Sequence, residues 1–158
     1  MTQRVRAVVG FGANLGDRLA TLRAALRELA TLTRVAKTSH VYATAPVGPP
    51  QPEYLNAAAL VEWEGSAEAL LDALLGIEAK LGRVRGERFG PRTVDLDVLW
   101  IEGLVEEGER LVVPHPRLKE RGFALVPLLE VAPDARDPRT GERYEAPPGD
   151  VRRAEDLL

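Results

Sequence analysis

The sequence contains no cysteine, so it forms neither a disulfide framework nor a thiolate metal site, which leaves oxygen and nitrogen atoms as its metal ligands. Long apolar runs are also missing, because none approaches the roughly 18 residues that a membrane-spanning helix needs. The apolar run that follows the first residues is too short for a signal peptide. These absences predict a cytoplasmic protein that does not contact a membrane.

The charge balance lacks the basic excess of a general nucleic-acid binder. The formal net charge is −3 at pH 7, whereas such a binder presents a strongly basic face. With 158 residues, of which 45% are hydrophobic, the chain has the size at which one core serves one domain. We therefore expect residues 1–158 to form a single domain that binds no nucleic acid.

Two aspartates on one predicted strand are the strongest chemical feature that is present. Asp95 and Asp97 stand in a run of β-branched and aliphatic residues. Strand side chains alternate, so both carboxylates face one way, roughly 6 to 7 Å apart, while Val94, Leu96 and Val98 face a core. Such charges repel each other unless a cation or arginines lie between them, and Mg²⁺ suits a carboxylate pair that also meets phosphates. The alternative is a solvent-facing strand edge, the commoner fate of an isolated pair.

Four arginines precede this pair in a segment where glycine and proline make continuous helix or strand improbable. The planar guanidinium matches phosphate oxygens, and a loop that contains glycine can close over a bound ligand. Their position directly ahead of the acidic strand favours polyphosphate binding over the alternative, a solvated loop. The arginines are Arg83, Arg85, Arg88 and Arg92, and the helix-breaking residues among them are Gly82, Gly86, Gly90 and Pro91.

Hydrophobic spacing predicts the element order β-α-β-β-α-β. Asp17 and Ser66 stand where helix N-caps are expected, each ahead of leucines at helical spacing. This order is the split βαβ arrangement of ferredoxin-like folds, an α+β class with an antiparallel sheet, helices packed on one face and the other face open for a site. Strands are expected over 5–11, 35–41, 55–63 and 94–99, helices over 19–29 and 70–81, an extra C-terminal strand over 111–113 and helical segments over 123–131. The tail from Pro133 is expected to be rich in loops.

Two polar residues stand out in addition to the acidic pair. Asn56 falls on the strand face opposite to Leu55 and Ala57, and its amide offers a donor and an acceptor to the edge of a heterocycle. Its alternative role is to bond neighbouring backbone. His115 lies between two prolines, so a fixed turn displays its ring, although an ordinary surface histidine fits the same pattern.

The segment 88–99, Arg-Phe-Gly-Pro-Arg-Thr-Val-Asp-Leu-Asp-Val-Leu, resembles the signature of the 6-hydroxymethyl-7,8-dihydropterin pyrophosphokinases, enzymes of the folate pathway. Four other segments resemble further marks of this family in the same order, and the resemblance runs from about residue 5 to residue 134. They are 10–17 (Gly-Phe-Gly-Ala-Asn-Leu-Gly-Asp), 54–58 (Tyr-Leu-Asn-Ala-Ala), 114–117 (Pro-His-Pro-Arg) and 121–123 (Arg-Gly-Phe). The fold of this family is similar to the one expected from the spacing.

The resemblance implies a single catalytic domain, a monomer, that transfers a pyrophosphoryl group from ATP to the 6-hydroxymethyl oxygen of the dihydropterin and releases AMP. It implies two Mg²⁺ ions, held by Asp95 and Asp97, with ATP as co-substrate. Catalysis of this type rests on positioning and charge stabilisation, which agrees with the lack of an obvious general base or covalent nucleophile in the sequence.

The resemblance also implies the roles of individual residues. Catalytic roles fall to Arg83, Arg92, Asp95 and Asp97. ATP binding falls to Glu78, Arg83, Arg85, Arg92, Val98, Arg110, Leu111, His115 and Arg121. Pterin binding falls to Thr44, Ala45, Pro46, Val47, Tyr54, Asn56, Asp95 and Phe123. Without the resemblance, Glu78 is a surface helix residue, Tyr54 and Phe123 are core aromatics, and His40 is structural.

Three residues depart from the usual family pattern: Phe89 stands where tryptophan is frequent, Ala13 where serine is frequent, and Leu75 where a polar residue can meet the adenine. Two other functions remain open on the residues alone. A two-metal phosphohydrolase uses the same aspartates and arginines with water as the nucleophile. A ferredoxin-like RNA-binding module requires aromatics and basic residues on the sheet face, where this sequence places two acids.

Overall fold

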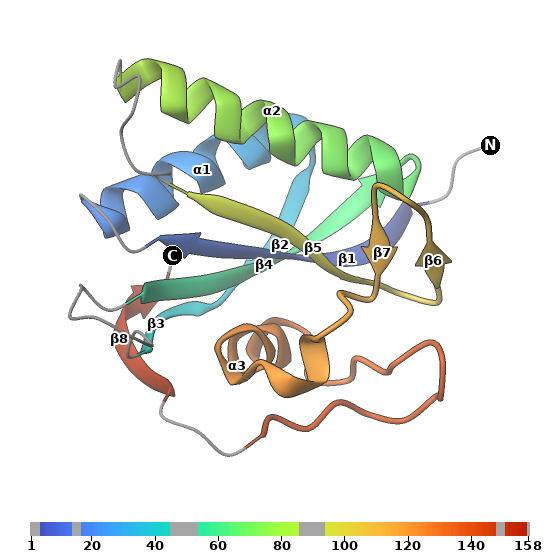
Figure 1. The fold of residues 1–158 in the computed structure, drawn as a ribbon. Coiled ribbons are helices and arrows are strands. Elements are labelled where there is room, and N and C mark those ends of the chain that lie inside the picture. Colours follow the sequence, from blue (N-terminus) through green and yellow to red (C-terminus); the bar gives the residue numbers. More distant parts are fainter. Residues whose placement is uncertain (1–3, 14–16, 45–53, 86–93, 148–150, 158) are drawn as a thin grey trace.

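A computed structural model describes residues 4–13, 17–44, 54–85, 94–147 and 151–157 and shows three layers. Helices α1 (Arg18–Leu32) and α2 (Ala67–Arg85) cover one face of a sheet, and α3 (Gly122–Val131) lies on the other face (Figure 1). The α+β class is confirmed, and the predicted β-α-β-β-α-β order is observed with its second strand divided into β2 and β3. No helix among the described residues is long and apolar enough to cross a membrane.

The main sheet has six strands, and every pairing in it is antiparallel. Its order is β5-β1-β4-β3-β8, with β2 also paired to β4. The strands are β1 (Arg4–Ala13), β2 (Arg34–Thr38), β3 (His40–Thr44), β4 (Tyr54–Glu64), β5 (Asp95–Ile101) and β8 (Val151–Leu157). The short pair β6 (Glu106–Glu107) and β7 (Val112–Val113) forms a separate ribbon, and a 3₁₀ turn spans Leu118–Glu120.

Both expected N-caps are confirmed. Asp17 accepts a 3.1 Å hydrogen bond from the backbone of Ala20 at the start of α1, and Ser66 accepts a 3.0 Å bond from that of Ala69 in α2. Leucines at helical spacing then pack both helices against the apolar side chains of β1, β4 and β5. This buried layer holds the strands that carry the site.

The second face of the sheet is not wholly open, which corrects the sequence-based expectation. Helix α3 packs Leu125 and Leu128 against Val8, Leu60 and Trp100, and these residues form a second core. The α3 sequence is almost entirely apolar and has no polar stripe. The spacing of its apolar residues therefore does not predict which face of the sheet the helix covers. The site therefore occupies only the part of this face that α3 leaves uncovered.

The strand expected over 35–41 is interrupted at Ser39, so β2 and β3 share β4 as a common partner. The backbone N–H of Ser39 donates to the carbonyl of Ala58, and the Ser39 hydroxyl accepts from the N–H of Ala58, both at 2.9 Å. A side-chain oxygen thus replaces one backbone acceptor of the ladder, an exchange that alternating hydrophobicity does not reveal.

One further expectation was wrong, and another was right only in part, because residues 133–147 form loops and turns as expected but a strand follows them. Helix α2 continues to Arg85, so Gly82, Arg83 and Arg85 belong to a helix and not to an irregular loop; a packed helix absorbs the cost of one glycine, about 1 kcal/mol. The tail beyond Pro133 contains strand β8, which pairs with β3. Its sequence is mostly charged and does not alternate, because it bonds an existing sheet edge through its backbone.

Candidate active site

The two aspartates lie in register with two glycines of the neighbouring strand. Asp95 pairs with Gly12 of β1, and Asp97 pairs with Gly10. On its other side, Gly12 pairs with Asn56 of β4. Directly paired residues of antiparallel strands project on the same sheet face, so one row runs from Asp95 across Gly12 to Asn56.

Gly12 leaves the centre of this row without a side chain, whereas the Leu99 side chain lies over Gly10. A Cβ atom on Gly12 would lie 3.1 Å from the Asn56 side-chain oxygen, and one on Gly10 would lie 2.9 Å from Leu99 Cδ1. Both distances are shorter than ordinary carbon contacts, so any larger residue would push on its neighbours. The sheet therefore presents bare backbone between a carboxylate and an amide.

A cleft of about 660 Å³ opens over this row. Its walls come from the middle of α2, the start of α3 and the strands β1, β3, β4 and β5, and they include both aspartates. Of the residues predicted for the site, the cleft brings together Thr44, Tyr54, Asn56, Glu78, Asp95, Asp97, Arg121 and Phe123. It also contains residues that the sequence did not single out, namely Gly10, Phe11, Gly12, Ala57, Leu71, Leu96, Leu99 and Ala124.

Glu78 is more than a surface helix residue. Its carboxylate accepts a 2.8 Å hydrogen bond from the backbone N–H of Leu96, which stands between the two aspartates. Leu75, one turn before it, is 46% exposed and lies on the cleft wall, so an apolar side chain occupies this part of the surface. Helix α2 thus contributes one acidic group, Glu78, and two apolar groups, Leu71 and Leu75, to the site.

The opposite end of the cleft has the composition expected for a flat heterocycle. Asn56 is buried, and its amide nitrogen donates to the Thr44 hydroxyl at 3.3 Å, which leaves the amide oxygen toward Gly12. Tyr54 and Phe123 are each 37% exposed, so neither is a core aromatic. The Arg121 guanidinium lies 5.6 Å from the centre of the Phe123 ring, a cation–π contact at the cleft wall.

A β-bulge at Leu99 places His115 next to the acidic strand, outside the residues that line the cleft. Val9 pairs with Val98 and Val8 with Trp100, so Leu99 is an extra residue on β5, and its carbonyl accepts a 2.9 Å bond from the His115 backbone. Burial lowers the pKa of the His115 imidazole below its ordinary value; nearby Asp97 opposes this shift, and the guanidiniums of Arg121 and Arg117 add to it.

The residues present fit a magnesium site that includes phosphate. Asp95 and Asp97 are exposed on one face of β5 and line the cleft, and both offer the hard oxygen ligands that Mg²⁺ prefers. Within the described part of the chain, no group of three or more acidic or histidine side chains is arranged to enclose a metal ion. Two carboxylates alone match an ion that takes its other ligands from substrate and water.

The remaining predicted residues lie in three places. Val98 and Leu111 are buried in the core, so only their backbones can meet a ligand. Arg110 is bonded to Asp72 of α2 at 2.6 Å, and His40 contacts Glu130, which agrees with a structural role. The side chains of Arg83 and Arg85, and all of Ala45, Pro46, Val47, Phe89 and Arg92, lie outside the described residues.

A signal for the glycine pair was present in the sequence. Ala7, Val9 and Phe11 alternate along β1 as buried residues, which places Val8, Gly10 and Gly12 on the other face. Glycine at two successive positions of one strand face marks a close approach to backbone. For Ala124 and Leu71 no comparable signal exists, because helix packing alone brings them to the cleft.

Comparison with known proteins gives consistent matches. A family model described as 7,8-dihydro-6-hydroxymethylpterin-pyrophosphokinase (HPPK) matches residues 8–133. A protein from Synechocystis named 2-amino-4-hydroxy-6-hydroxymethyldihydropteridine pyrophosphokinase is 45% identical over 138 residues, which cover 86% of this chain and 71% of that protein. A protein of the same name from Methylorubrum extorquens is 47% identical over 132 residues, or 82% of this chain and 84% of that protein.

Solved structures share the fold. A crystal structure of HPPK-DHPS in complex with substrates superposes with a TM-score of 0.68 at 14% identity, covering 90% of this chain. Wild-type Plasmodium falciparum HPPK-DHPS superposes with a TM-score of 0.67 at 12% identity. This chain spans 42% and 44% of the length of those two proteins, respectively.

Proposed function

Because this chain belongs to the 7,8-dihydro-6-hydroxymethylpterin-pyrophosphokinase family, a family of transferases, we propose that it transfers the pyrophosphoryl group of ATP to 6-hydroxymethyl-7,8-dihydropterin. The hydroxymethyl oxygen attacks the β-phosphorus, the bond from that phosphorus to the α-phosphate oxygen breaks, and AMP leaves. The products are AMP and the pterin diphosphate.

One observation carries this proposal: the aspartate pair and the Asn56 amide share a single cleft, with the bare backbone of Gly12 between Asp95 and Asn56. The aspartates supply a phosphate-and-metal end, and Asn56 with Thr44 supplies a hydrogen-bonding end. A phosphate donor and a heterocyclic acceptor can therefore meet over the backbone between them. A simple phosphohydrolase has no need of the second end.

We assign the roles of the chain's own groups from their places in the cleft. Asn56 and Thr44 hold the pterin edge, and Tyr54 and Phe123 cover its ring faces. Arg121 meets phosphate oxygens from the cleft wall. The family resemblance gives the same role to His115, Arg83, Arg85 and Arg92. Glu78 orients the strand between the aspartates. The positioning of these groups supplies most of the catalysis, because phosphoryl-type transfer needs no covalent protein nucleophile.

Asp95 and Asp97 would hold two Mg²⁺ ions. When bound, these ions neutralise charge on the phosphate oxygens and on the leaving AMP. We also propose that residues 1–158 act as one catalytic domain and as a monomer, since every described wall of the cleft comes from one sheet and the helices packed on it.

The proposal is tested by incubating the purified protein with ATP and Mg²⁺, with and without 6-hydroxymethyl-7,8-dihydropterin, and resolving the nucleotides formed. We expect AMP and pterin diphosphate in equal amounts, and only when the pterin is present. Formation of ADP would indicate transfer of a single phosphoryl group. Hydrolysis of ATP at the same rate without the pterin would favour the phosphohydrolase.

A further inference from the structure

Strand β8 begins between two walls of the cleft. Its first residue, Val151, pairs with Thr44 at the end of β3. Val151 also lies against Gly122 at the start of α3, because a Cβ atom on Gly122 would be 3.4 Å from Val151 Cγ2. One half-buried valine thus contacts both a strand end and a helix start that face the cleft.

The residues next to these contacts are those that line the pterin end. Thr44 accepts the 3.3 Å hydrogen bond from the Asn56 amide. Gly122 stands between Arg121 and Phe123, and both of these side chains lie on the cleft wall. Val151, together with Pro147 and the direct packing of α3 on β3 and β4, therefore contributes to the separation between the Thr44 edge and the Arg121–Phe123 edge.

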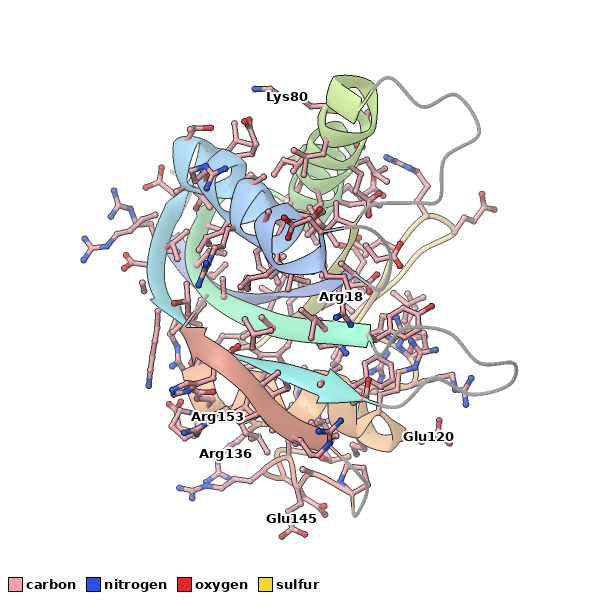
Figure 2. The ribbon with its side chains drawn as sticks, turned by 90° about the vertical axis from the view of Figure 1, so that its left-hand side faces the viewer. Arg18, Lys80, Glu120, Arg136, Glu145 and Arg153 are labelled. Carbon is pink, nitrogen blue, oxygen red and sulfur yellow. The ribbon has the colours of Figure 1, made fainter. Side chains whose placement is uncertain are left out.

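The C-terminal end of α3 is held to β3 by separate hydrogen bonds. Glu130 accepts hydrogen bonds from the Tyr42 hydroxyl at 2.6 Å and from the His40 backbone at 3.0 Å, which ties α3 to β3. Val151 makes the corresponding contact at the near end, beside the cleft. Figure 2 shows β8, which carries Arg153, crossing alongside β3 with α3 behind it. The matched family region ends at residue 133, so the contact made by Val151 lies outside it.

We propose that Val151 is a positioning residue for the pterin end of the site, setting the distance between Thr44 and the Arg121–Phe123 edge. The identity of the ligand rests on the proposed function, whereas the mechanical link between the two walls does not. Removing the valine methyl groups would let the start of α3 move relative to β3. The separation of the two cleft edges would then no longer match the pterin. The groups of the phosphate-and-metal end on α2 and β5 would keep their geometry, and only Arg121 among the proposed phosphate contacts of the cleft wall lies on the edge that moves.

The test compares three variants by steady-state kinetics. Val151→Ala removes the contact, and Val151→Thr keeps its branched shape and one methyl group. Val35→Ala is the matched control, because Val35 is also half-buried on a sheet strand but packs against the α1 and α2 core. We expect Val151→Ala to raise the KM for the pterin about five-fold or more, with the KM for ATP within about two-fold of wild type. Val151→Thr should restore the pterin KM, and Val35→Ala should change neither constant.

A second readout needs no activity. Amide hydrogen exchange is measured on the ligand-free chain, where the N–H groups of Ala124 and Leu125 donate to the Arg121 carbonyl at 3.0 and 2.9 Å. We expect faster exchange at 43–44 and 122–125 in Val151→Ala but not in Val35→Ala. Unchanged exchange and an unchanged pterin KM in Val151→Ala would overturn the proposal, and so would equal effects of the two valine substitutions. If wild type forms no pterin-dependent AMP, the proposed function fails, and exchange alone decides the positioning role.

Discussion

The backbone N–H of Leu96 donates a 2.8 Å hydrogen bond to the Glu78 carboxylate. Leu96 stands between the two aspartates and points its own side chain into the core. Helix α2 therefore holds the acidic strand from the side opposite to the α3 core. Because a third carboxylate lies near the pair, it also adds to the negative potential that attracts cations to this end of the cleft.

Glu78→Ala removes the acceptor of this bond and leaves the Leu96 N–H without it. We expect the Mg²⁺ concentration for half-maximal rate to rise and the unfolding free energy to fall by about 1 kcal/mol. Glu78→Gln keeps an acceptor oxygen and should retain most of the rate. Activity titrated with Mg²⁺ and urea unfolding measure the two effects; a Gln variant as impaired as the Ala variant would mean that charge, not the bond, matters.

Asp97→Ala removes one of the paired carboxylates. We expect a loss of the order of 100-fold or more in kcat, several kcal/mol of transition-state stabilisation, because the remaining aspartate cannot hold the second ion. The exposed Glu109, beyond the cleft lining, provides the control Glu109→Gln, which should leave kcat unchanged. A near-normal kcat for Asp97→Ala at saturating Mg²⁺ would contradict the two-ion assignment.

Gly12→Ala places a methyl group 3.1 Å from the Asn56 oxygen. We expect a higher KM for the pterin, because Asn56 must shift from the position that meets the pterin edge, with a smaller effect on the KM for ATP. Gly76→Ala is the control, since a Cβ there meets nothing within 4 Å; this helix substitution should stabilise the protein by about 0.5 to 1 kcal/mol. Kinetics and thermal unfolding of both variants separate the effects.

The buried Asp137 carboxylate should make a contribution to the unfolding free energy that is lost at low pH. Its side chain is 6% exposed and pairs with Lys119 at 2.7 Å. Burial alone raises the pKa of this carboxyl, but the Lys119 and Arg139 hydrogen bonds outweigh burial and hold it below the ordinary value of 3.8. A carboxyl with a lowered folded-state pKa stabilises the fold above its unfolded pKa, and that contribution is lost as the pH falls through the folded value.

Asp137→Asn should therefore lower the unfolding free energy near neutral pH by about 1 to 3 kcal/mol. Below pH 3.8 the difference from wild type should shrink, because the wild-type carboxyl then loses its charge, first in the unfolded chain and at lower pH in the folded protein. Thermal unfolding between about pH 2.5 and 7 measures both curves. A constant gap over this range would show that the charge of Asp137 is not what stabilises the 137–142 turn.

Much of the fold followed from periodicity in the sequence. The alternation around Leu96 and the leucine spacing behind Asp17 and Ser66 each reflect one side chain in contact with one core, so each could be read locally. The family resemblance is likewise confirmed. The acidic pair faces outward as the strand period requires, and six other predicted residues reach the same cleft.

The missed features depend on partners that lie far away in the sequence. The break at Ser39 needs the Ala58 backbone, and the bulge at Leu99 needs the register of β1. Strand β8 forms because β3 offers an unpaired edge, which no pattern within its charged sequence records. The place of α3 over the second face depends on Val8 and Trp100, two residues in other elements.

The floor of the cleft at Gly12 is main chain, with the Leu99 side chain over the adjacent Gly10, and this limits how the site can change. A compound that rests on this floor hydrogen-bonds to backbone atoms, and a substitution cannot remove these atoms. Escape by replacing either glycine would force Leu99 or Asn56 out of place, so the change that excludes the compound would also disturb the natural ligand. Inhibitors designed against this strip of the sheet should therefore be slow to select resistant variants.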